Sequence, residues 1–267
     1  PPHLTTISST YFRIIRRSIL AIKTNYSTNR IMIFPGEVFA ETKKFDTNIR
    51  QLLPYYDQML DAIGVGVPSQ RSGIVELACG TGQLTVKVLK QCPHAELVAV
   101  DYSPRMIDFV GAKLDAQGER DRVKTLQLDF GAWANDEADA EVGSQFDAII
   151  SSLAIHHLTD EMKGKLFQKI ARSLSLGGQF WNADPLLPEF PELTDIYQQS
   201  RQRWAQKQGF DLEAVRSKIG KSDTQGYSSQ DQLATLDRHF QMLKEAGFSK
   251  TAVIWKYYNL GVFGGLL

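Results

Sequence analysis

The sequence of 267 residues contains only two cysteines, Cys79 and Cys92, and carries no excess of charge of either sign. Two thiols cannot build a disulfide framework, and their spacing does not match a metal-binding pair, so we expect both to be reduced. No apolar run is long enough to span a membrane. The 30 Lys and Arg balance 30 Asp and Glu. The basic surface of most nucleic-acid binders is therefore absent, and we expect neither nucleic acid nor a membrane as partner.

Acidic residues are also missing from residues 1–36, where Arg and Lys supply the charge among many Ser and Thr. This composition resembles an organellar transit peptide. An equally good interpretation is upstream sequence or an artefact, because the first methionine is Met32. In both cases we expect the segment to lie outside a folded domain spanning 37–267. A cytoplasmic location is expected, or an organellar one where the transit-peptide interpretation holds.

What the sequence does contain is an alternation of short apolar runs with amphipathic segments. A helical stretch from Glu37 to Ala62, broken at Pro54, precedes a linker at 64–73. Seven strands are expected, at 74–77, 97–100, 123–128, 146–151, 179–183, 251–257 and 259–263. Helices are expected at 84–91, 105–116, 161–174 and 230–246. The pattern predicts a doubly wound α/β fold with a mostly parallel, Rossmann-like, seven-stranded sheet. The polar stretch 185–228 is predicted to form an inserted helical cap.

A glycine-containing loop follows the first predicted strand, in the stretch Glu76-Leu77-Ala78-Cys79-Gly80-Thr81-Gly82. Gly80 and Gly82 allow a sharp turn and close approach of a ligand. The third glycine of the dinucleotide fingerprint is missing, because Thr85 occupies its place. The carboxylate of Glu76 would repel a pyrophosphate, whereas it suits a ligand with an ammonium and a sulfonium. The loop therefore favours S-adenosylmethionine over a dinucleotide.

Acidic residues also end the next two predicted strands. Asp101 lies 19 positions after Gly82, at the tip of the second strand, where it can accept from both ribose hydroxyls. Tyr102 follows and can pack against the adenine. Asp129 can accept from the adenine amine, and Phe130 can cover the ring.

Taken in order, these motifs resemble those of class I S-adenosylmethionine-dependent methyltransferases. The loop at 76–82 is similar to the first family motif, with Ala78 in place of a glycine, and 101–106, 129–130 and 146–158 are similar to the next three. The resemblance covers Glu37 to the C-terminus and implies a methyl-transferring enzyme with S-adenosylmethionine as cofactor. The cofactor-binding residues expected from the motifs are Glu76, Ala78, Gly80, Gly82, Asp101, Tyr102, Met106, Asp129, Phe130 and Ser151. To these we add Arg50, for the methionine carboxylate, and Tyr55 or Tyr56, which would close over the site. The alternative is an exposed helical Arg50 and two tyrosines that only pack.

Two histidines, His156 and His157, follow the fourth predicted strand, which ends beside the cofactor. Either one can act as a general base for an acceptor that must lose a proton. The alternative is a structural role at the start of the next helix. No metal-ligand set is recognisable, so no metal is expected.

The order and spacing of the segments around Arg50 and the C-terminal tail look like the carboxy-S-adenosylmethionine synthase family and related methyltransferases. In that family a cap arginine holds the extra carboxylate, and here Gln206 stands at the similar position. A neutral amide lacks the charge that a carboxylate prefers. We therefore favour ordinary S-adenosylmethionine, although Arg201 and Arg203 lie nearby.

The acceptor is expected to be a small molecule, because the Asn/Asp-Pro-Pro-Tyr/Phe motif of base-methylating enzymes is absent after the fourth strand, where Ser151-Ser152-Leu153-Ala154 stands. The stretch Asp184-Pro185-Leu186-Leu187-Pro188, which follows the fifth strand, is interpreted as a loop. Two alternatives stay open: a carboxy-S-adenosylmethionine-type enzyme acting in tRNA modification, and a non-catalytic S-adenosylmethionine-binding protein. A homodimer formed through the cap is a further expectation.

Overall fold

A computed structural model describes residues 42–214 and 231–267, all within one compact unit, Pro35–Leu267. The predicted N-terminal segment and the second part of the predicted cap lie outside the described residues. Among the residues described, no helix is both long and apolar enough to cross a lipid bilayer.

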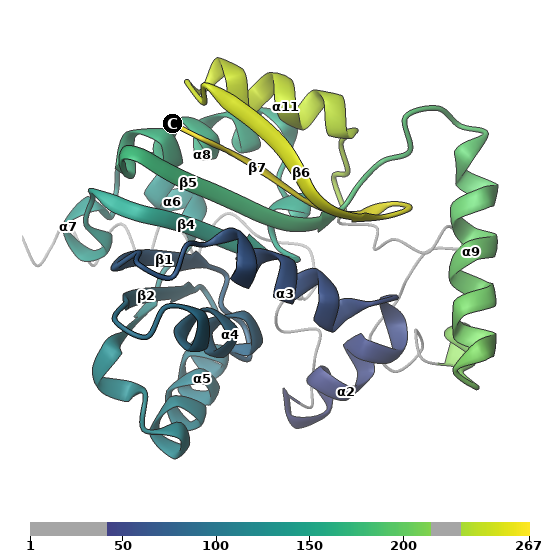
Figure 1. Cartoon of the computed structure of the whole chain (residues 1–267), viewed down its shortest axis with the longest axis horizontal. Coiled ribbons are helices and arrows are strands. Elements are labelled where there is room, and N and C mark those ends of the chain that lie inside the picture. Colours follow the sequence, from purple (N-terminus) through teal and green to yellow (C-terminus); the bar gives the residue numbers. More distant parts are fainter. Residues whose placement is uncertain (1–41, 215–230) are drawn as a thin grey trace, which may run out of the picture. The chain divides into compact units, whose positions relative to one another are not determined.

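A seven-stranded sheet forms the centre of the fold, with strand order β3-β2-β1-β4-β5-β7-β6 (Figure 1). The first five strands are parallel, and β7 runs antiparallel between β5 and β6. This confirms the predicted doubly wound, mostly parallel architecture. The strands are β1 (Gly73–Leu77), β2 (Glu96–Asp101), β3 (Val123–Gln127), β4 (Phe146–Ser152), β5 (Leu174–Pro185), β6 (Lys250–Tyr257) and β7 (Leu260–Leu266).

Successive strand residues point to opposite sides of the sheet, so apolar residues on each strand form two cores. Helices cover the sheet on both faces. Ile74 and Ile150 belong to the core on one side, and Val75 and Ile149 belong to the core on the other. The first core includes residues of α2 (Thr42–Leu52), α3 (Tyr56–Gly66), α4 (Gln83–Gln91) and α5 (Pro104–Gln117). The second includes residues of α6 (Phe130–Ala134), α7 (Asp139–Val142), α8 (Asp160–Ser173) and α11 (Leu236–Glu245). Burial on both faces explains why the central strands β1 and β4 are mostly apolar, whereas the edge strand β3 carries several polar residues.

The helix boundaries follow local signals. Pro54 separates α2 from α3, and Pro104 occupies the first turn of α5. Thr159 caps α8 by accepting from the Met162 N–H. In the predicted cap, the described helix is α9 (Leu193–Lys207). The short helices α6 and α7 were not predicted, since four and five residues are too few for a periodic signal.

Three predicted boundaries are wrong. The linker at 64–73 is shorter, because α3 continues to Gly66, where the backbone packs closely on the sheet. A Cβ at Gly66 would lie 2.8 Å from Ile254 Cδ1, and the Gly66 carbonyl accepts from Trp181 Nε1. The predicted loop at 184–188 begins later, because Asp184 and Pro185 end β5, paired with Gly261 and Leu260, and only 186–188 lie outside the strand.

The helix predicted at 230–246 is also too long, because α11 begins at Leu236, with Thr235 as its cap. The preceding residues 231–235 are extended, and their backbone bonds to other segments. Gln232 N donates to the His156 carbonyl (2.7 Å), and the Ala234 carbonyl accepts from Leu187 N (3.0 Å). These tertiary hydrogen bonds replace those of a first helical turn. The sequence pattern predicts the helical turn and gives no indication of the tertiary bonds.

Candidate active site

The glycine-containing loop joins the carboxyl end of β1 to α4. Three alternate residues of this loop have left-handed backbone angles: Ala78 (φ 58°), Gly80 (φ 51°) and Gly82 (φ 72°). A Cβ at Gly82 would lie 2.5 Å from Val110 Cγ2, so the loop packs on α5 at this point. No atom lies within 4 Å of a Cβ placed at Gly80, which leaves the backbone there open to a ligand.

The positive φ of Ala78 makes Ala78→Gly a stabilising substitution. Alanine in the left-handed region costs about 1–2 kcal/mol. Glycine removes this strain, but the greater entropy of its unfolded chain offsets roughly 0.4–1 kcal/mol of the gain. We expect the free energy of unfolding in urea to rise by up to about 1 kcal/mol. Ala99→Gly, in the buried part of β2, is the control and should lower it. Equal losses of stability in both variants would contradict the strain assigned to Ala78.

Glu76 is fully buried near the end of β1. Its Oε2 accepts a hydrogen bond from Thr85 Oγ1 at 2.6 Å, whereas its Oε1 is buried without a hydrogen-bond partner. Burial raises the pKa of the Glu76 carboxyl to about 8, against the opposing effect of the Thr85 hydroxyl. An unmatched acceptor of this kind suits a cationic donor such as the ammonium of S-adenosylmethionine, so the residues present fit that cofactor.

Asp101 ends β2 and is 5% exposed. Its two oxygens accept backbone hydrogen bonds from Gly80 N (2.8 Å) and Ser103 N (2.9 Å). Burial raises the pKa of the Asp101 carboxyl, which these backbone donors oppose. The carboxylate thus connects the loop after β1 to the start of α5, and its remaining lone pairs are available to ribose hydroxyls. Ser103 itself makes no side-chain cap to α5.

The other predicted cofactor residues lie along the same edge of the sheet. Asp129 is exposed and caps α6 by accepting from Gly131 N at 2.7 Å, and Phe130 begins that helix. Tyr102 follows β2 directly, and Met106 is buried in α5. Ser151 is fully buried and donates to the Leu77 carbonyl at 3.0 Å, so its hydroxyl joins β4 to β1. Contact of these five side chains with the cofactor stays a prediction.

Helix α2 is attached to the loop by side chains. Asp46 accepts hydrogen bonds from Thr81 Oγ1 and Gln83 Nε2. Arg50 donates to both carboxylate oxygens of Asp57 (2.9 Å each) and to Gln83 Oε1 (3.0 Å). The predicted pairing of Arg50 with the methionine carboxylate would therefore add to, or replace, an existing ion pair.

Tyr55 lies between α2 and α3 with a left-handed φ of 57° and is 42% exposed. Its ring contacts that of Tyr257, with centroids 4.7 Å apart, and the Tyr257 ring contacts Tyr258. Tyr258 in turn lies against Tyr197 of α9. Because β7 begins opposite Pro185, at the carboxyl end of β5, this tyrosine cluster lies at the same edge of the sheet as the cofactor loop.

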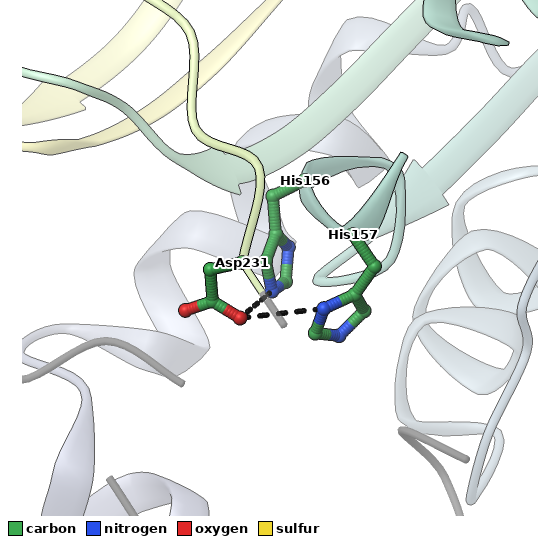
Figure 2. A group of neighbouring side chains, drawn as sticks. All are labelled: His156, His157 and Asp231. Atoms are coloured by element: carbon green, nitrogen blue, oxygen red, sulfur yellow. Dashed lines mark ion pairs between the residues drawn. The ribbon is translucent and has the colours of Figure 1, made fainter. Parts of the chain in front are cut away.

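His156 and His157 end the short helix η3 (Ile155–His157) after β4. His156 Nδ1 lies 2.7 Å from Asp184 Oδ1, and its Nε2 lies 3.8 Å from Asp231 Oδ1. His157 Nδ1 lies 3.3 Å from the same oxygen of Asp231 (Figure 2). Burial lowers the pKa of His157, more than Asp231 raises it, which favours the neutral imidazole.

Three acids of this edge were missed in the sequence: Asp46, Asp184 and Asp231. The signal for Asp184 was present, as an acid near the end of a predicted strand, but the following proline suggested a loop. Asp46 and Asp231 lie far in sequence from the motifs that they contact, and nothing in their local pattern marks them.

Comparison with known proteins gives the family of the chain. Residues 74–178 match a family model described as a methyltransferase domain. The uncharacterized methyltransferase YrrT of Bacillus subtilis is 30% identical over 165 residues, covering 62% of this chain and 68% of the relative. A carboxy-S-adenosyl-L-methionine synthase of Nautilia profundicola is 25% identical over 226 residues, covering 82% and 88%.

The chain spans only part of other relatives. An uncharacterized methyltransferase of Exiguobacterium sibiricum is 28% identical over 141 residues. This match covers 53% of this chain and 58% of the relative. The fold is shared with an O-methyltransferase family protein of Burkholderia thailandensis, with a TM-score of 0.63 at 14% identity, covering 96% of this chain and 69% of that one. The match to YrrT over two thirds of its length, together with the methyltransferase domain at 74–178, shows that the chain belongs to the class I S-adenosylmethionine-dependent methyltransferases.

Proposed function

We propose that the protein transfers a methyl group from S-adenosylmethionine to a small-molecule acceptor by in-line displacement. The observation that carries the proposal is the buried Glu76, whose Oε1 has no hydrogen-bond partner beside the first turn of α4. A cationic cofactor satisfies this acceptor, and a pyrophosphate does not. The cofactor supplies the methyl group and the sulfonium leaving group, so the chain has to bind, orient and exclude water.

The tyrosine cluster of Tyr55, Tyr197, Tyr257 and Tyr258 supports a small acceptor with a planar or apolar part. These rings meet edge to face, which is a favourable aromatic geometry, and Tyr55 and Tyr258 are 42% and 40% exposed. They join the start of α3 to the β6–β7 turn and to α9. We propose that the acceptor binds against them, and that the predicted cap sets its selection. Pairing of two copies through the cap stays a prediction.

A carboxylated cofactor is the second candidate, because the similarity to carboxy-S-adenosyl-L-methionine synthases extends over 82% of the chain. Gln206 near the end of α9 is neutral, and Arg203 is exposed. Arg201 donates to the Leu52 carbonyl at the end of α2 through Nε (3.1 Å) and Nη2 (3.0 Å). We favour the ordinary cofactor, since a guanidinium already holding a backbone carbonyl is a weaker partner for a new carboxylate.

The test is to incubate the full chain with S-adenosylmethionine labelled in its methyl group and a metabolite extract, and to find the label by mass spectrometry. We expect the label in a small molecule, and much less labelled product with an Asp101→Ala variant at the same limiting cofactor concentration. Label found in RNA or protein would contradict the proposed acceptor class. Cofactor binding without any transfer would favour a non-catalytic binding protein, and a carboxylated cofactor consumed or formed would favour the second candidate.

A further inference from the structure

Three side chains with metal-ligating atoms meet at the carboxyl end of β4. They are His156 and His157 of η3, and Asp231 from the extended segment before α11 (Figure 2). One ligating atom from each, His156 Nε2, His157 Nδ1 and Asp231 Oδ1, lies within 4.8 Å of the other two. Within residues 42–214 and 231–267, this is the only such group of three His, Cys, Asp or Glu side chains.

The spacing of these atoms matches the edges of a metal coordination sphere. Ligand atoms about 2.0–2.2 Å from Zn²⁺ in a tetrahedral site are about 3.4 Å from one another. The Asp231 oxygen lies 3.3 Å from His157 Nδ1 and 3.8 Å from His156 Nε2. The third separation, between His156 Nε2 and His157 Nδ1, is at most 4.8 Å. A rotation of one imidazole would bring all three atoms to the separations of one coordination sphere.

A second carboxylate orients the first ligand. Asp184 is fully buried, and its oxygens face His156 Nδ1 (2.7 Å), the His156 backbone N–H (3.1 Å) and Asn182 Nδ2 (2.8 Å). When His156 Nδ1–H donates to Asp184, the lone pair is on Nε2, directed toward Asp231. Such a carboxylate on the far nitrogen of a histidine is typical of metal-ligating imidazoles.

The segment that carries Asp231 is fixed at the next residue. Gln232 donates its N–H to the His156 carbonyl at 2.7 Å and accepts through its own carbonyl from the fully buried Lys163. These bonds tie Asp231 to the same turn that carries both histidines. The donor set is therefore positioned by the backbone of η3 and by α8, which favours a preformed site.

We propose that His156, His157 and Asp231 bind one divalent transition-metal ion of the Zn²⁺ class. Two imidazoles and one carboxylate suit zinc and its first-row neighbours better than Mg²⁺ or Ca²⁺, which prefer oxygen ligands. Three protein ligands leave at least one coordination position open for water or an acceptor oxygen. The site does not depend on the proposed methyl transfer, whereas its use in orienting an acceptor does. A bound ion would occupy the lone pairs of His156 Nε2 and His157 Nδ1. Neither nitrogen could then act as the general base predicted from the sequence.

The test is a titration of the tag-free full chain with Co²⁺ and Zn²⁺. We expect one equivalent of Co²⁺ to bind with visible d–d absorption and to be displaced by Zn²⁺. His157→Ala and Asp231→Asn should weaken binding by about 100-fold or more, and Asp184→Asn by about 10- to 100-fold. His94→Ala is the control, because His94 is exposed and distant in sequence, and it should bind as the wild type does.

Folding of each variant is checked by its melting temperature, which Zn²⁺ should raise in the wild type and in His94→Ala but not in Asp231→Asn. Where a variant does not fold, X-ray absorption of the zinc-loaded wild type replaces it, and two imidazole ligands are expected. The proposal is overturned when no saturable metal binding occurs, when Asp231→Asn and His157→Ala bind as tightly as wild type, or when the absorption spectrum lacks imidazole. All of these readouts are independent of methyl transfer.

Discussion

Replacing Asp101 by alanine is expected to weaken binding of S-adenosylhomocysteine by about 10- to 1000-fold. The carboxylate lies at the carboxyl end of β2 and already accepts backbone hydrogen bonds from Gly80 and Ser103. A carboxylate has about four lone-pair sites, which the backbone donors do not fill, and each further bond from a ribose hydroxyl to the charged group contributes about 1.5–3 kcal/mol. Calorimetric titration of the folded variant measures the affinity.

Asp147→Ala is the matched control for this substitution. Asp147 also accepts from two backbone N–H groups, of Ser72 (2.9 Å) and Gly73 (3.2 Å), but it does so at the amino end of β1, opposite the cofactor loop. Both substitutions should lower the melting temperature, and only Asp101→Ala should weaken binding. An unchanged affinity in Asp101→Ala, with a lowered melting temperature, would reduce Asp101 to a purely structural role.

Replacing Glu76 by glutamine is expected to weaken cofactor binding by about 10- to 100-fold, because a neutral amide cannot give the ammonium a charge-assisted hydrogen bond. The same substitution should make the ligand-free protein more stable than wild type at alkaline pH. Glutamine keeps an acceptor for Thr85 Oγ1 and removes the requirement to ionise a fully buried carboxyl.

The pH dependence follows from the direction of the pKa shift. Glu76 has its pKa raised from 4.5 to about 8, so the folded protein keeps a proton that the unfolded chain loses between these values. The resulting stabilisation is fully present below pH 4.5 and is lost as the pH rises to about 8. Urea unfolding across this window should give a flatter profile for Glu76→Gln. Glu96→Gln, on the exposed start of β2, should follow wild type. Parallel profiles for wild type and Glu76→Gln would contradict the assigned burial effect.

The sheet could be predicted from sequence because its signals are local. Strands β1 and β2 are mostly apolar runs, of which β1 is followed by a glycine-containing turn and β2 ends at an acid, and the alternation of strands with helices predicts a parallel sheet. The loop at 76–82 and the acid Asp101 could be located for the same reason, since their roles depend on where a strand ends.

The acceptor side of the site could not be predicted, because it depends on tertiary hydrogen bonds. The extended segment 231–235 has a helical composition, yet Gln232 and Ala234 bond to His156 and Leu187 in place of a helical turn. The pairing of His156 with Asp184 joins residues 28 positions apart. Similarly, the sequence predicts Arg50 as a cation for the methionine carboxylate and does not indicate its ion pair with Asp57.

The edge of the sheet formed by β1 and β2 is expected to bind S-adenosylmethionine and not a dinucleotide. Calorimetric titration of the full chain with S-adenosylhomocysteine, alone and with excess NAD, distinguishes the two ligands. We expect one binding site for S-adenosylhomocysteine, with a dissociation constant that NAD does not change. Saturable NAD binding that S-adenosylhomocysteine displaces, or no binding of S-adenosylhomocysteine to the folded protein, would contradict it.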